Sequence, residues 1–146
     1  MAEPDPKADL HRYLQTAREA LLWKLEGLSE YDIRRPLTPT GTNLLGLVKH
    51  VASVEIGYFG DTFARPFGEP LPWRPAERAE VTLHRILVHV IAETNRHCGH
   101  ADIVRELIDG AVGLRDGTAN MAPGDQAWWE GYRSRLELVA RQAGRG

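Results

Sequence analysis

The sequence is poor in cysteine and in long apolar runs. Its 146 residues include a single cysteine, Cys98, so no disulfide can form within the chain. No apolar run approaches the ~20 residues that a membrane-spanning helix needs. The first residues, MAEPDPKADL, are polar and acidic and show no signal-peptide pattern. These absences favour a cytoplasmic protein that does not cross a membrane.

A strong excess of charge is missing as well. The formal net charge is −2 at pH 7, so the basic surface that nucleic-acid binding requires is not expected. No internal repeat or low-complexity segment is apparent in the sequence. With 42% hydrophobic residues, a chain of this length should fold as one domain, residues 1–146, around a buried core.

Apolar residues recur at intervals of three and four in four stretches, as one face of a helix requires. The first helix has a good start at Asp5, a capping residue that Pro6 follows. Segments rich in proline or glycine, such as 30–41, separate the stretches and are expected to be loops. The fold class is therefore all-α, an antiparallel four-helix bundle. The expected helices cover approximately residues 6–29, 43–63, 84–110 and 125–142.

The helix expected over residues 84–110 carries polar residues on the face that should be buried. An apolar line that starts at Ile86 is interrupted and resumes at Val104; the interrupting residues are Glu93, His97 and His100. Burial of such groups is costly unless they are paired, hydrogen-bonded or metal-bound. Carboxylate and imidazole ligands suit zinc, nickel or iron, and a catalytic site leaves one position open. A hydrogen-bonded polar pocket, or exposure of this face to solvent, is the alternative.

A further metal ligand would have to come from another helix. His50 lies three residues after Leu47 and four before Val54, so it also points inward. A single histidine on an apolar face is more often a core residue with satisfied hydrogen bonds than a ligand. His50 becomes a candidate only because the later helix needs a partner.

The stretches TPTGTNLLGLVKHVASVEIGYF and HVIAETNRHCGHADIVRELIDG resemble the DinB-like superfamily of small helical metalloproteins. The C-terminal WWEGYRSRLE is similar to a branch of that superfamily whose function is largely unassigned. The resemblance implies a four-helix bundle with three metal ligands, His50 in the motif Leu-Val-Lys-His and the pair Glu93 and His97. His100 is then expected to orient a ligand or a metal-bound water. His97 with His100 as the ligand pair is the competing assignment.

The same resemblance carries an expectation about activity. Members of the superfamily with known activity transfer or rearrange groups with low-molecular-weight thiols such as mycothiol or bacillithiol. The resemblance implies a divalent metal ion, zinc or nickel, that binds the thiol sulfur and lowers its pKa. It therefore implies a metal-dependent transferase or isomerase that forms a homodimer. The alternative is a non-enzymatic metal-binding or dimerisation module that keeps the bundle without the chemistry.

The resemblance also draws attention to a shortened segment. Superfamily members normally have another long helix before the ligand-bearing one, but only about twenty residues separate Phe63 from Leu83, too few for a loop, a helix and a return. The bundle should therefore have one empty position. We expect the C-terminal helix, with Trp128, Tyr132 and Leu136, or the same region of a second chain, to cover it.

Two other predictions concern the ligand-bearing helix. Cys98 lies about 100° around the helix from His97, so it should face elsewhere and is not expected to be catalytic. Asp102, Arg105 and Glu106 are expected to form ion pairs on the outer face, where such pairs add little stability.

Overall fold

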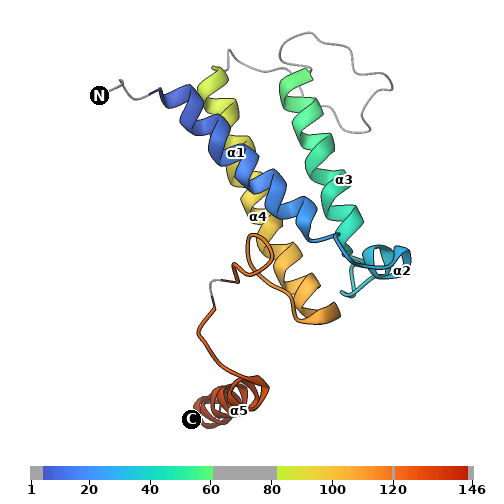
Figure 1. Cartoon of the computed structure of the whole chain (residues 1–146), viewed down its shortest axis with the longest axis vertical. Helices are drawn as coiled ribbons and strands as arrows, with labels where there is room; N and C mark the ends of the chain where they lie inside the picture. Colours follow the sequence, from blue (N-terminus) through green and yellow to red (C-terminus); the bar gives the residue numbers. More distant parts are fainter. Residues whose placement is uncertain (1–4, 61–81, 120, 145–146) are drawn as a thin grey trace.

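The structure, a computed structural model, describes residues 5–60, 82–119 and 121–144, and within these ranges its regular secondary structure is helical (Figure 1). It confirms the all-α fold class. The described ranges contain no strand and no helix long and apolar enough to cross a membrane. The elements are α1 (Pro6–Trp23), α2 (Glu30–Arg34), α3 (Leu44–Glu55), the π-helix η1 (Ile56–Gly60), α4 (Leu83–Asp109) and α5 (Gln126–Ala143).

Helix α1 begins as expected but ends earlier. The Asp5 carboxylate accepts hydrogen bonds from the backbone N–H groups of Lys7 and Ala8, at 3.0 and 3.2 Å, and Pro6 opens the first turn. The expected helix to residue 29 stops at Trp23, because the next turns tighten to i→i+3 hydrogen bonds. Gly27, at φ 73°, then adopts a left-handed conformation that ends the helical path.

The expected loop over residues 30–41 contains the short helix α2. Ser29 caps it, since its hydroxyl accepts a hydrogen bond from the backbone N–H of Asp32 at 3.1 Å. Helix α3 starts after Asn43, whose side chain accepts from the N–H of Gly46 at 2.8 Å. The helix continues as η1, so the expected helix over 43–63 is present as far as Gly60. Residues 61–63 lie outside the described residues.

Helix α4 matches its prediction to within one residue. Thr82 caps its start, and Gly110, with a left-handed φ of 80°, closes its end. Figure 1 shows α3 running antiparallel to α1 and α4, which run in the same direction as each other. The core that these three helices share is made of Leu14, Ala17, Ala20, Leu21, Leu44, Leu47, Val51, Val54, Ile86, Leu87, Val90, Cys98, Ala101 and Val104.

A buried polar cluster joins the C-terminal end of α1 to α4. Arg105 is only 7% exposed and donates hydrogen bonds at 2.9 Å to the backbone carbonyls of Lys24 and Glu26. The buried Lys24 ammonium pairs with Asp102 and donates to the carbonyl of Gly113. The expectation that Arg105 lies on the outer face was wrong, because the carbonyls in the turns just after α1 need donors and Arg105 supplies them.

Helix α5 lies apart from the other three long helices (Figure 1), and none of its residues is buried. Of the two expected ways to cover the empty position, coverage by α5 of the same chain is therefore wrong, and coverage by a second chain stays a prediction. The segment that we expected to be shortened falls on residues 61–81, outside the described residues.

Candidate metal centre

The polar residues of α4 lie at the edge of the core and face α3. The buried face of α4 runs through Thr94, Cys98 and Ala101. Each of these residues comes directly after Glu93, His97 or His100 in the sequence, so the three polar residues lie beside the buried face. As a result Glu93 and His97 are partly buried and His100 is exposed. The predicted interruption of the apolar stripe is thus a polar border beside the stripe, open to solvent on one side.

His50 reaches this border from α3. Its Nε2 lies 3.4 Å from Oε1 of Glu93, and Nε2 of His97 lies 3.0 Å from the same oxygen. The two imidazole rings meet nearly edge to face, with centroids 4.6 Å apart. The structure therefore brings together three residues from two helices whose ligand atoms all lie within 4.8 Å of one another, a group that could hold a metal ion.

The spacing of these atoms suits a tetrahedral ion. Ligands about 2.0–2.1 Å from zinc at tetrahedral angles lie roughly 3.3–3.4 Å from one another. The distances from Glu93 Oε1 to His50 Nε2 and His97 Nε2, 3.4 and 3.0 Å, are close to that edge length. Two imidazole nitrogens and one carboxylate oxygen are also a donor set that zinc and nickel accept. The residues thus fit a divalent ion in donor type and in two of the three distances between ligand atoms, and the third distance is within 4.8 Å.

The electrostatics favour an ionised Glu93. Burial alone would raise the pKa of its carboxyl group, but hydrogen bonds from His97 and His50 outweigh burial, and His97 and Arg96 add favourable charge. The pKa of Glu93 is therefore lowered from its ordinary value. An ionised carboxylate at neutral pH is the form that a metal ligand requires.

His100 contacts the far side of His97. The two Nδ1 atoms are 3.3 Å apart, a distance at which one ring N–H donates to the other ring nitrogen. Since Nε2 of His97 faces Glu93, this contact fixes the rotation of the imidazole through its second nitrogen. The close group thus consists of His50, Glu93 and His97, with His100 beside it.

Tyr58 contacts α4 one helical turn before the site, a contact that the sequence did not indicate. Its ring lies 4.6 Å from that of His89, centroid to centroid, and His89 is one helical turn before Glu93 on α4. Tyr58 belongs to η1, where the wider π-helical turn changes the direction in which side chains project. An apolar pattern of ordinary helical spacing gives no signal of such a turn.

Cys98 faces away from the group, as expected. It is buried in the core, and its Sγ donates a hydrogen bond to the backbone carbonyl of Ala17 at 3.2 Å. Burial, with a contribution from Asp102 and against the effect of Lys24, raises the pKa of the thiol from 9.0 to about 11. A buried thiol with this pKa is a poor nucleophile at neutral pH.

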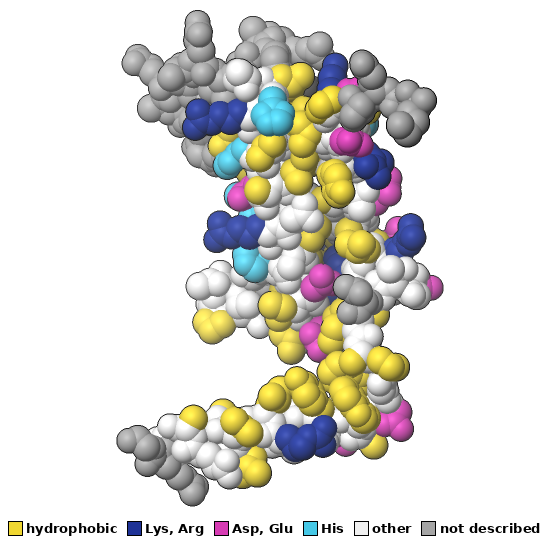
Figure 2. Space-filling view, turned by 90° about the vertical axis from the view of Figure 1, so that its left-hand side faces the viewer, with side chains coloured by type: hydrophobic (Ala, Val, Ile, Leu, Met, Phe, Trp, Pro, Cys, Tyr) yellow, Lys and Arg dark blue, Asp and Glu magenta, His cyan; other side chains and the backbone are white. Residues whose placement is uncertain are grey.

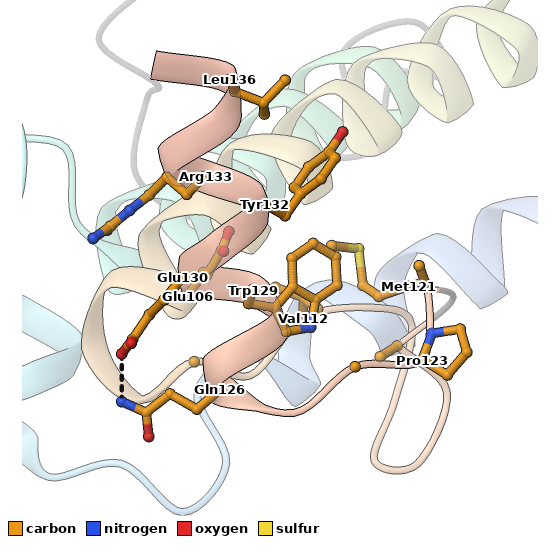
Figure 3. Close-up of a pocket in the computed structure, with 14 residues that line it drawn as sticks. Glu106, Val112, Met121, Pro123, Gln126, Trp129, Glu130, Tyr132, Arg133 and Leu136 are labelled. Carbon is orange, nitrogen blue, oxygen red and sulfur yellow. Dashed lines mark hydrogen bonds between the residues drawn. The ribbon is translucent and has the colours of Figure 1, made fainter. Parts of the chain in front are cut away.

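A separate cavity of about 770 Å³ lies between the end of α4, the following linker and α5. Figure 3 shows Trp129, Tyr132 and Leu136 on its α5 side, and Met121 on its linker side. None of the three clustered residues on α3 and α4 lines it. This cavity is therefore distinct from the candidate metal centre.

A family model described as mycothiol-S-transferase matches the chain over residues 9–80 and 68–110. Together the two matches run over more than half of the sequence and include His50, Glu93, His97 and His100. No curated protein and no solved structure matches the chain.

Proposed function

The chain belongs to the mycothiol-S-transferase family, a member of the DinB-like superfamily, and we propose that it is a divalent-metal-dependent enzyme acting with a low-molecular-weight thiol. The reaction proposed is transfer or isomerisation, with a mycothiol- or bacillithiol-like thiol as cosubstrate. The observation that carries this proposal is the group of His50, Glu93 and His97 at the interface of α3 and α4.

In this proposal His50, Glu93 and His97 hold the ion, zinc or nickel, and His100 orients His97. The close approach of their ligand atoms and the lowered pKa of Glu93 support these roles. The His50 side chain is 44% exposed, whereas that of His97 is 12% exposed. The open side of the site is therefore beside His50, where a thiol can approach.

A bound divalent ion would lower the pKa of the thiol and hold it as a thiolate near neutral pH. The contribution of the chain is to fix the donor atoms and to exclude water from one side. Val90 and Cys98, on the adjoining face of α4, keep that side apolar. The thiol gives up its proton to solvent, and its sulfur forms a bond to an electrophilic carbon of the acceptor as the bond from that carbon to a leaving group breaks, with the electron pair going to the leaving group.

A second candidate function is a metal-binding or dimerisation module that keeps the bundle but has no turnover. The exposed apolar face of α5 favours it, because such a face is expected in an assembly. The same face supports the proposal that the protein is a homodimer. We also propose that it is a single-domain cytoplasmic protein that does not bind nucleic acid, in keeping with its net charge of −2.

The test begins with metal content. Protein purified without chelator should contain about one divalent ion per chain, and His97→Ala should lose it. His84→Ala, at the exposed start of the same helix, is the matched control and should keep it. Equal metal content in His97→Ala and in the unmodified protein would overturn the assignment.

Activity separates the two candidate functions. The metal-loaded protein is incubated with mycothiol, or with bacillithiol, and a panel of electrophilic acceptors, and thioether formation is followed by mass spectrometry. The enzyme proposal expects turnover that falls with the metal content of His97→Ala. Full metal occupancy without turnover on either thiol would support the non-enzymatic module.

A further inference from the structure

Helix α5 has one apolar face that the described part of its own chain covers only in part. Trp128, Trp129, Tyr132, Leu136 and Val139 fall within about 100° of arc around this helix. None of these residues is buried. Trp128 stacks on Tyr132 with ring centroids 5.4 Å apart, and Trp129 meets Tyr132 edge to face at 5.9 Å. A continuous aromatic and aliphatic face of this kind is typical of a helix that packs against a partner.

The helix needs such packing to be stable. Helix α5 has 18 residues, only a little more than the ~12–15 residues below which isolated helices are marginal in water, and most helical stability in proteins comes from burial of an apolar face. Helix α5 also contains Gly131 and several aromatic residues, which lower its intrinsic helix propensity. A stable α5 therefore implies a surface that covers its apolar face.

A matching surface is present at the end of α4. Ile103 and Leu107, one turn apart, are 60% and 62% exposed. Figure 2 shows hydrophobic side chains along the edge of α5 that is turned toward the lower end of the bundle, across an open notch. The cavity of about 770 Å³ lies between the end of α4 and α5. It has room for side chains of another helix.

The linker after α4 holds α5 away from its own bundle. The backbone N–H of Gly113 donates to the Asp102 carboxylate at 2.9 Å, and Lys24 donates to the carbonyl of Gly113. The backbone N–H of Leu114 then donates to the carbonyl of Thr118 and closes a turn. This anchoring fixes the start of the linker to the bundle, and α5 projects from it (Figure 1).

We propose that two copies of this chain associate by exchanging α5. The apolar face of each α5 then packs against Ile103, Leu107 and the cavity at the end of α4 in the other copy. Two-fold exchange covers the apolar face of α5 and the exposed end of α4 at once, because each copy supplies both of these surfaces to the other. This interface does not depend on the proposed metal or on the proposed reaction.

The area is sufficient for a stable dimer. With roughly 100 Å² accessible on each of the five side chains, the α5 face offers on the order of 500 Å². The surface that receives each α5 loses a similar area, and the two-fold symmetry repeats the contact, so the interface would bury on the order of 2,000 Å². Stable specific interfaces bury about 1,200–2,000 Å².

The first experiment measures the mass of the full-length chain in solution by light scattering over a concentration series. The monomer is 16.3 kDa, and we expect twice that mass at micromolar concentration. Leu136→Asp should weaken the dimer at least tenfold. Leu138→Asp is the matched control, since Leu138 is 56% exposed against 52% for Leu136 but lies about 130° from the centre of the apolar face. A monomeric unmodified chain, or equal effects of both variants, would overturn the proposal.

The second experiment distinguishes exchange from packing of α5 on its own chain. Separately prepared Ile103→Cys and Leu136→Cys proteins are mixed and oxidised, with unmodified protein as the control for the buried Cys98. Exchange predicts a disulfide-linked species of doubled mass in the mixture. The chain that carries both substitutions should likewise give linked dimers. Only a monomer with an internal disulfide in the double variant, and no linked species in the mixture, would show that α5 packs on its own chain.

Discussion

Among single residues, Glu93 has the most consequential position. One of its oxygens lies within 3.4 Å of His50 and 3.0 Å of His97, so this carboxylate bridges two helices. The sequence predicted Glu93 and His97 from their spacing along α4, which is local information, whereas His50 was predicted from the resemblance of its motif to the superfamily. It did not predict that His100 would contact His97 through its Nδ1, because ring rotations depend on what packs around them.

The contact between His100 and His97 predicts a graded effect on metal affinity. His100→Ala should weaken zinc binding about 10–100-fold, because His97 loses the group that fixes its ring. His97→Ala removes a ligand and should have a larger effect. Competition with a chromogenic chelator gives the affinities, and His84→Ala is the control. If His100→Ala binds zinc as weakly as His97→Ala does, His100 is itself a ligand and the competing assignment is correct.

Asp109 carries a prediction about pH. Hydrogen bonds from Arg105, at 2.6–2.9 Å, lower the pKa of this carboxyl group, although burial opposes them. A folded-state pKa below the unfolded value of ~3.9 stabilises the protein above that pH, and the stabilisation is lost as the pH falls through the folded pKa. Asp109→Asn should therefore cost about 1 kcal/mol at pH 7.

This cost should diminish as the pH falls from about 4, where Asp109 begins to be protonated in the unfolded state, through its lower folded-state pKa, and should vanish once both states are protonated. Urea unfolding of Asp109→Asn and of the unmodified protein at pH 7, 5 and 3 measures the difference. A difference that is the same at pH 3 as at pH 7 would show that the charge of Asp109 is not the cause.

At the scale of helices, the sequence predicted those elements whose ends have their own signals. Asp5, Gly110 and Asp125 are capping residues, and the helices beside them were predicted to within about a residue at those ends. The position of Arg105 was not predictable in the same way, because it depends on hydrogen bonds between parts of the chain about eighty residues apart.

The contacts of Arg105 predict that α1 and α4 are fastened together by this residue. Arg105→Ala leaves one buried carbonyl, one partly buried carbonyl and the Asp109 carboxylate without their donor, which should cost roughly 2–4 kcal/mol. Arg12→Ala is the matched control, because its ion pair with Asp9 is exposed and should cost under about 1 kcal/mol. Chemical denaturation followed by circular dichroism measures both. Similar losses in the two variants would show that the buried contacts of Arg105 contribute little.

At the scale of the molecule, the candidate metal centre joins two parts of the chain. His50 and Glu93 are 43 residues apart in sequence, and the segment 61–81 connects their helices. The sequence could not show that α5 lies apart from the bundle. An apolar stripe indicates that a helix packs, but the stripe carries no information about which chain provides the other surface.

This arrangement predicts that metal stabilises the whole bundle. An ion held by α3 and α4 binds the folded state alone, and zinc at a hundred times its dissociation constant adds about 2.7 kcal/mol, or on the order of 10 °C in the melting temperature. The measurement is thermal unfolding of metal-free protein at pH 7 with and without added zinc. Because protons compete with metal for imidazole nitrogens, the increase should disappear at pH 5. His97→Ala should show no increase at either pH, whereas His84→Ala should respond as the unmodified protein does. The same increase in His97→Ala would mean that zinc stabilises the fold at some other place.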